Sequence, residues 1–154
     1  LNNIGTTGAM TAATMISART VRMKHKGPAS KVYLATVPRI WLGPLELGDA
    51  ARAIYASQWD PSKTTQVPNP VYGAIPPGNV IDSPYLSVSS ATRHYFFADP
   101  ARMPVIAVGF INGREAPEVI QFQNEEFDGI RFRILHDHGE AIVDYRGAVT
   151  CAGV

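Results

Sequence analysis

The residues that come nearest to a chemical site are two histidines and a glutamate, His136, His138 and Glu140. Alternate residues of a strand share one face, and two imidazoles with a carboxylate are a ligand set for a divalent metal ion. The chain is, however, expected to reverse direction at residues 137–139, and a turn there would take the three side chains off a common face. We therefore predict ordinary polar turn residues and no metal site.

Other reactive residue types are no better placed for catalysis. Cys151 is the single cysteine and lies three residues from the end of the sequence, where fraying is expected instead of an activated thiolate. No glycine-flanked serine is placed as a nucleophile elbow, and no glycine-rich loop is suited to phosphate. Glu125, Glu126 and Asp128 cluster near a turn, where a solvated edge is more common than a general acid and base. The sequence thus predicts neither an enzyme nor a cofactor.

The composition favours a packed globular protein. The 154 residues are 45% hydrophobic and 18% charged, and a chain of this length can bury a core without disulfide support. One compact unit, or two interlocked small ones, is expected. The sequence has no apolar run of about 18 residues and no secretory signal, which disfavours a membrane protein or a secreted one.

Charge is distributed unevenly along the sequence. The first 45 residues hold six basic residues and no acid, while the rest hold eight basic and thirteen acidic residues, so the two parts carry +6 and −5. A basic helix packed on an acidic sheet of the same molecule accounts for this pattern, and so does contact with acidic neighbours or with nucleic acid. The net charge of +1 argues against a dedicated nucleic-acid binder.

A long helix is predicted near the start of the sequence, over Thr7–Lys26. Gly27-Pro28 provides the stop signal for this helix. Apolar residues recur at steps of three and four, which indicates one buried stripe. That stripe comprises Ala9, Ala12, Ala13, Ile16, Thr20 and Met23, and a separate face carries Arg19, Arg22 and Lys26.

The segment after this helix predicts a strand, a second helix and a long loop. β-branched and aromatic residues indicate a strand over Lys31–Val37, and Pro44 is suited to the start of a second helix. Gln58–Val80 contains five prolines and two glycines, so we expect an extended surface segment without a core of its own.

The last third of the sequence reads as a sheet. Three turns are indicated, at Asn112-Gly113, Asp128-Gly129 and His138-Gly139, and the first is a strong hairpin signal because both residues tolerate positive φ. Alternation at residues 130–134 predicts a strand with one buried face and one wet or partner-facing face. The candidate strands are Arg93–Ala98, Val105–Ile111, Val119–Gln123, Ile130–Leu135 and Ala141–Arg146.

Several segments resemble a known family. Phe127–Gly139, followed by Ala141–Gly147, is similar to the closing segment of tailed-bacteriophage major capsid proteins, above all the Mu-type major head subunit. Tyr95–Pro100 and Pro104–Gly113 resemble that family's preceding strands and hairpin. Lys31–Trp41 is similar to the strand and turn that enter its axial domain.

The resemblance implies an α+β architecture, the Hong Kong 97-type capsid fold. Residues 1–30 and 116–154 would form the peripheral domain, with the spine helix laid along long strands, and residues 31–115 would form the axial domain. Members of the family are longer, with an N-terminal arm and an extended loop ahead of the spine helix. The sequence is therefore either a trimmed portion, or other molecules supply those contacts.

The implied function is that of a self-assembling structural subunit of an icosahedral phage head around double-stranded DNA. Its partners would be copies of itself in pentamers and hexamers, together with portal, scaffold or decoration proteins, and packaged DNA through weak non-specific contact. The protein would be made in the host cytoplasm, reside in the virion and bind no membrane. The candidate interface residues are Arg19, Arg22, Lys26, Arg131, Arg133, Asp144 and Arg146.

Three alternatives stay open at this point. An encapsulin-type compartment shell has the same fold and encloses enzymes instead of DNA. A small metal-binding β-barrel enzyme similar to cupins would use His136, His138 and Glu140, with His94 as a further ligand. A β-rich binding module would hold its ligand in the proline-rich segment.

Overall fold

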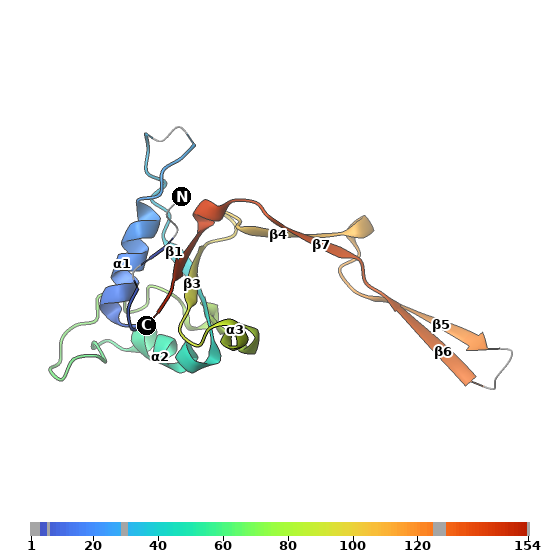
Figure 1. Ribbon diagram of the computed structural model, residues 1–154, viewed down its shortest axis with the longest axis horizontal. Helices are drawn as coiled ribbons and strands as arrows, with labels where there is room; N and C mark the ends of the chain where they lie inside the picture. Colours follow the sequence, from blue (N-terminus) through green and yellow to red (C-terminus); the bar gives the residue numbers. More distant parts are fainter. Residues whose placement is uncertain (1–3, 6, 29–30, 125–128, 154) are drawn as a thin grey trace. The chain divides into compact units, whose positions relative to one another are not determined.

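The computed structural model describes residues 4–5, 7–28, 31–124 and 129–153, and it has an α+β architecture. The chain divides into two compact units (Figure 1). The first unit consists of Leu1–Val105 and Asp144–Val154, and the second of Ile106–Val143. No helix within the described ranges has the length and hydrophobicity needed to cross a membrane.

A four-stranded sheet forms the centre of the first unit, in the order β2-β1-β3-β8. β2 lies parallel to β1, whereas β3 is antiparallel to both β1 and β8. Trp41 and Phe96 face each other across β1 and β3, and both are buried. The strands are β1 (Pro38–Gly43), β2 (Val80–Asp82), β3 (His94–Ala98) and β8 (Ala148–Cys151).

The strand expected over Lys31–Val37 is displaced to β1, so that prediction was wrong. The segment folds back on the residues that follow the first helix, through hydrogen bonds from Leu34 N to the His25 carbonyl and from Gly27 N to the Val32 carbonyl. Ala35 has a φ of 48°, which interrupts an extended chain. Pro38 takes the first place of β1, where a strand tolerates a residue without an N–H.

The first helix, α1 (Ala12–Met23), is shorter than predicted because Thr11 caps it. The Thr11 hydroxyl accepts from Thr14 N, and the Thr14 hydroxyl accepts from Thr11 N, which forms a capping box. The buried residues are Ala12, Met15, Ala18 and Arg22. Ala12 of the predicted stripe is buried as expected, but most of the other members were placed on the wrong side. Small residues on several faces made more than one apolar stripe possible.

The first unit has two more described α-helices, α2 (Leu45–Ala56) and α3 (Pro84–Ser89). α2 packs against β2, and α3 packs against α2. α2 begins directly after Pro44, as predicted, whereas α3 was not anticipated. The proline-rich segment is irregular as expected, but Val71 and Ile75 enter the core. Asn69 anchors that segment, because its amide donates to the carbonyls of Ile54 and Ser57 at the end of α2.

The second unit is built from two antiparallel strand pairs. β4 (Ile106–Phe110) pairs with β7 (His138–Ile142), and β5 (Glu118–Asn124) pairs with β6 (Gly129–Leu135). The described residues form 3₁₀ turns at η1 (Pro77–Asn79) in the first unit, η2 (Ile111–Gly113) in the second, and η3 (Tyr145–Gly147) just before β8.

The predicted turns have different outcomes. Asn112 and Gly113 have φ of 56° and 69° and form the predicted turn. The strands beside it do not pair with each other, because β4 pairs with β7 and β5 pairs with β6. The turn at His138-Gly139 was wrong, since both residues lie inside β7 opposite Phe110 and Gly109. Asp128 of the third turn lies outside the described residues, and Gly129 begins β6.

The last predicted strand was partly wrong. Pairing ends at Ile142, Asp144 caps η3, and β8 follows. Of the strands after Ala116, β8 contacts α1 in the first unit, whereas β5, β6 and β7 belong to the second unit. The division into peripheral and axial domains remains a prediction.

Candidate functional site

The two histidines and the glutamate do not form a metal-binding cluster. His138 and Glu140 lie in β7, and the rings of His136 and His138 are 5.0 Å apart. The His136 ring also lies 5.9 Å from that of Phe110. Across the described part of the chain, no group of three His, Cys, Asp or Glu residues is placed to hold a metal ion.

Two further residue types considered for chemistry are buried in the first unit. Cys151 is held in β8 instead of being frayed, which corrects that expectation, and burial raises its pKa to about 11. A thiol with such a pKa is a poor nucleophile near neutral pH. His94 lies opposite Cys151 on β3, and burial lowers its pKa. The acids Glu125, Glu126 and Asp128 lie outside the described residues.

The β5–β6 pair has two chemically different faces. Residues directly opposite each other in an antiparallel pair point to the same side, so the register assigns each residue to a face. The first, here the uncharged face, consists of Val119, Gln121, Gln123, Ile130, Phe132 and Ile134. The second, here the arginine face, consists of Glu118, Ile120, Phe122, Arg131, Arg133 and Leu135.

The uncharged face is open to solvent within the chain. Its four apolar residues, Val119, Ile130, Phe132 and Ile134, are 59%, 60%, 60% and 68% exposed. The prediction of one buried face along residues 130–134 was therefore wrong for a single chain, because no second layer of the second unit covers it. An isolated two-stranded hairpin is marginally stable in water, and apolar surface of this kind marks an interaction site.

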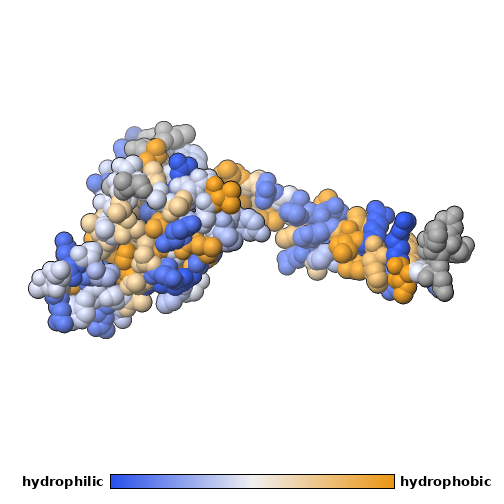
Figure 2. Space-filling model, turned by 60° about the horizontal axis from the view of Figure 1, so that its bottom comes forward, coloured by the Kyte–Doolittle hydropathy of each residue, from blue (hydrophilic) through white to orange (hydrophobic). Residues whose placement is uncertain are grey.

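The arginine face combines charge with apolar surface. Phe122, Arg131 and Arg133 of this face line a shallow open hollow together with Gln123 and Phe132 of the uncharged face. Glu118 is neutralised by an ion pair with Arg114, whereas Arg131 and Arg133 have no ion pair among the described residues. Figure 2 shows hydrophobic and hydrophilic residues side by side on the surface of the second unit.

The β4–β7 pair also has two different faces. Ala107, Gly109, Gly139 and Ala141 share one face, which therefore carries no side chain larger than a methyl group. The opposite face carries Ile106, Val108, Phe110, His138, Glu140 and Ile142.

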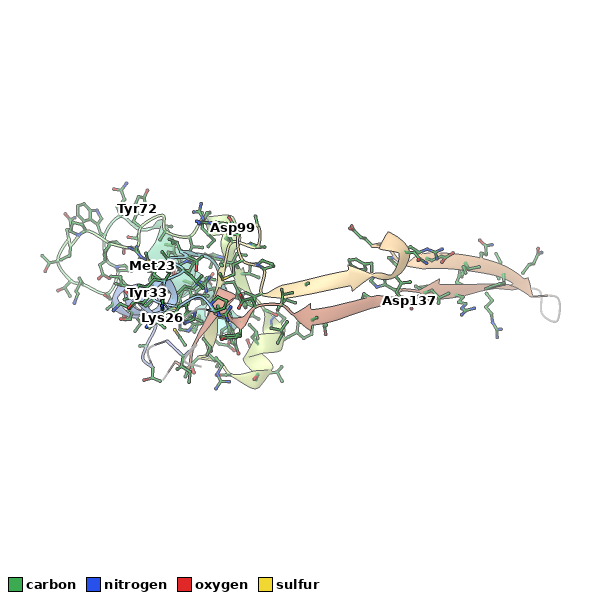
Figure 3. All side chains as sticks on the ribbon, turned by 90° about the horizontal axis from the view of Figure 1, so that it is seen from above. Met23, Lys26, Tyr33, Tyr72, Asp99 and Asp137 are labelled. Atoms are coloured by element: carbon green, nitrogen blue, oxygen red, sulfur yellow. The ribbon has the colours of Figure 1, made fainter. Side chains whose placement is uncertain are left out.

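The basic residues predicted on one face of α1 lie in different environments. Arg19 and Lys26 are exposed, and the Lys26 ammonium lies 5.8 Å from the centre of the Tyr33 ring (Figure 3). Arg22 is instead completely buried. One end of its guanidinium donates to the Arg146 carbonyl, and the other donates to Thr36 Oγ1 at 3.2 Å. This position does not favour direct contact between Arg22 and a neighbouring molecule.

Asp144 and Arg146 form a local pair. Asp144 accepts from Arg146 N at 2.9 Å and lies 3.4 Å from the Arg146 guanidinium. Burial lowers the pKa of Arg22 to about 10, and the charge of Asp144 opposes that shift. These three residues hold η3 to the end of α1.

Sequence reasoning missed an apolar and acidic surface on the first unit. Tyr85 and Val88 of α3 are 85% and 90% exposed, and Leu45 and Ile81 are also exposed. The Ser87 hydroxyl accepts from Leu45 N and donates to Glu46 Oε2 at 2.8 Å, which joins α3 to the start of α2. We call this surface the α2–α3 patch, and it comprises Leu45, Glu46, Asp49, Tyr85 and Val88. Ser83-Pro84, a common helix start, was the sequence signal for α3.

Three acids and one arginine set the charge around the α2–α3 patch. Arg52 makes ion pairs with Asp49, at 3.1 Å, and with Asp82. Glu46 has no cationic partner within the described ranges and adds to the charge of the two aspartates. The surroundings of the patch therefore carry a net charge of −2.

The described residues thus present surfaces suited to contact and no cluster suited to catalysis. The chain belongs to the phage capsid protein family, since the model of that family matches residues 1–151. Its role is accordingly that of a structural capsid protein, a component of the virion. Comparison with curated proteins gives no match, and comparison with solved structures gives none either.

Proposed function

We propose that this protein is the major capsid protein of a tailed phage, of the Mu type and with the Hong Kong 97-type fold. Copies of the chain would assemble through pentamers and hexamers into an icosahedral shell around double-stranded DNA. Residues 1–30 and 116–154 would serve as its peripheral domain and residues 31–115 as its axial domain. The observation that carries the proposal is the second unit, whose strand pairs expose apolar residues that a single chain leaves uncovered.

Burial of the uncharged face of β5–β6 is the source of affinity in this proposal. Covering apolar surface stabilises an assembly by about 25 cal/mol for each Å² removed from water. A capsid protein meets many identical neighbours at high local concentration, so its uncovered apolar surfaces are expected to be filled by copies of the same chain.

The charge of the two units supports contact between copies. The second unit holds three basic and seven acidic residues, a net charge of −4, whereas the first holds eleven basic and six acidic residues, a net charge of +5. Opposite charges on two parts of one chain attract the unlike parts of neighbouring copies and direct their encounter.

Among the predicted interface residues, Arg19, Lys26, Arg131 and Arg133 are the exposed ones. The basic residues of α1 are suited to weak, non-specific contact with packaged DNA. Portal, scaffold and decoration proteins would be further partners, and synthesis would take place in the host cytoplasm. Catalysis has no part in the proposed function.

The test is a charge reversal on the arginine face. The variant carrying Arg131→Glu and Arg133→Glu should keep the fold, because both side chains are exposed, and should form fewer particles, with a defect that depends on salt. Arg39→Glu with Arg93→Glu makes the same change of charge at exposed positions of the first unit and serves as the control. Normal particle yield from the first variant in electron microscopy would count against the proposal.

The content of the particles distinguishes a phage head from an encapsulin-type compartment. A phage head contains DNA, whereas an encapsulin-type compartment contains protein.

A further inference from the structure

We infer that the arginine face of β5–β6 in one copy docks on the α2–α3 patch of a second copy. This inference rests on the proposed function and adds to it the two surfaces that meet. Neither surface is covered by other described residues of its own unit, and both combine apolar side chains with charges of one predominant sign.

The apolar parts of the two surfaces match in character. Ile120, Phe122 and Leu135 lie on the arginine face. The exposed side chains of Tyr85 and Val88 are the corresponding apolar groups on the patch. Contact between such groups supplies the affinity of an interface, because aromatic and aliphatic anchors contribute most when they are fully desolvated.

The charged parts of the two surfaces are opposite in sign. Arg131 and Arg133 stand on the same face, and the nearby acid Glu118 is already paired with Arg114. The patch offers Glu46, which has no cationic partner among the described residues, and Asp49, which shares Arg52 with Asp82. A guanidinium binds a carboxylate through two parallel hydrogen bonds. Charges at an interface chiefly select the partner and set the register, so we expect these residues to decide which surfaces meet.

Other exposed surfaces fit the arginine face less well. The exposed residues around the end of α1, Arg19, Lys24 and Lys26, would repel two arginines. The uncharged face of another hairpin offers them no carboxylate. Of the surfaces that the described residues form on the first unit, the α2–α3 patch joins uncovered aromatic surface to excess acid.

The test uses three variants of the full chain. The first carries Arg131→Glu and Arg133→Glu, the second carries Glu46→Lys and Asp49→Lys, and the third carries all four changes. We expect association, measured by analytical ultracentrifugation, to fall about tenfold or more in each of the first two variants, because like charges then face each other. The third variant should regain association, since the two signs are exchanged.

Mixing the first two variants separates contact between copies from contact within one chain. In a mixture, the glutamates of the first variant can meet the lysines of the second, and the native arginines of the second can meet the native acids of the first. We therefore expect association to return in the mixture. Association, and not the yield of closed particles, is measured in the mixture. The two variants would have to alternate around a ring, and a ring with an odd number of subunits cannot close in that way.

The possible results distinguish the inference from the proposed function. Loss in the first variant without loss in the second would overturn the assignment of the patch and leave the assembly role intact. Recovery in the fourfold variant without recovery in the mixture would place the contact within one chain and overturn the inference. A wild-type chain that never associates would contradict the proposed function itself.

Two controls exclude misfolding and net charge as causes. Circular dichroism should match the wild type for all three variants. The two variants with Glu46→Lys and Asp49→Lys should unfold at a slightly lower temperature, because these changes remove the Ser87–Glu46 hydrogen bond and the Arg52–Asp49 ion pair. Glu115→Lys with Asp137→Lys makes the same change of charge as the second variant, at exposed sites of the second unit. We expect this control to associate as the wild type does, and a loss equal to that of the second variant would overturn the inference.

Discussion

Arg22 is a buried cation in an α-helix of a structural protein, and its contacts explain why it is there. Its guanidinium spans the distance from α1 to the Arg146 carbonyl and to Thr36, which are far apart in the sequence. Burial of a charge is unfavourable unless hydrogen bonds compensate it. Arg22 therefore acts as a structural tie between α1, the segment before β1 and η3.

Truncation of Arg22 should destabilise the first unit. We expect Arg22→Ala to lower the free energy of unfolding by about 2–4 kcal/mol, since it removes packed methylene groups and leaves the Arg146 carbonyl without its charged donor. Arg22→Lys should cost about 1–2 kcal/mol, because an ammonium cannot span both acceptors. Urea unfolding checks both values. Arg19→Ala, at an exposed site of the same helix, is the control. Equal stability of Arg22→Ala and Arg19→Ala would contradict the structural role of Arg22.

His94 should make stability depend on pH. It lies between Trp41 and Phe96, and burial lowers its pKa although a hydrogen bond with the Thr92 carbonyl opposes that shift. The folded chain thus favours neutral His94, and the unfolded chain binds more protons once the pH falls below about 6.5. The contribution of His94 to the free energy of unfolding should be greatest above that pH and should decline below it. In His94→Phe this part of the decline should disappear, and an unchanged pH dependence in thermal unfolding would be evidence against the role of His94.

At the residue scale, exposed charges were easier to predict than buried ones. Alternation along residues 130–134 correctly put Arg131 and Arg133 on one face of a strand. Arg22 was placed on the surface because arginine is rarely buried, and no local signal reveals that Thr36 and the Arg146 carbonyl converge on it. Burial of His94 and Cys151 likewise depends on β3 and β8 meeting across more than 50 positions of sequence.

At the scale of elements, η3 and β8 return the chain to the sheet of the first unit, and Gly147 makes that return possible. A Cβ at this position would meet the side chain of Val105 and would lie 3.2 Å from the Met103 carbonyl oxygen. The chain therefore passes where only a glycine leaves room for its neighbours.

Gly147→Ala should lower the free energy of unfolding by about 1–3 kcal/mol through overpacking. Shortening the obstructing side chain should relieve part of this loss, so Gly147→Ala with Val105→Ala is expected to be more stable than the two separate losses added together. Chemical unfolding of the double-mutant cycle measures the coupling. Strictly additive losses would show that the two positions do not interact.

Elements with strong local signals were predicted, whereas their pairing was not. Pro44 marked the start of α2, and β-branched and aromatic residues marked β3, β4, β5 and β6 to within about two residues. The turn at Asn112-Gly113 was correct in conformation but wrong as a hairpin, because strand pairing depends on contacts distant in sequence. α3 and β8 are short, and their packing on other elements specifies them more than their own residues do.

At the scale of the whole molecule, the sequence motifs near the C-terminal end identified the capsid family, and the match over residues 1–151 confirms it. The compact units end at other residues than the proposed domains. The strand pairs of the second unit chiefly contact each other, whichever domain they belong to. Contacts alone therefore do not assign these strands to the peripheral or the axial domain. The two faces of β5–β6 became visible only with the register. The exposure of their residues shows that no described layer of the second unit covers them.

Electron microscopy of the purified chain at increasing concentration tests the central claim most directly, with sedimentation at low and high salt as the quantitative companion. If the apolar strand pairs and the opposite charges bind other copies of the chain, the protein should form capsomer rings or polyhedral particles. High salt should weaken these assemblies. A homogeneous monomer at every concentration and salt would contradict that account.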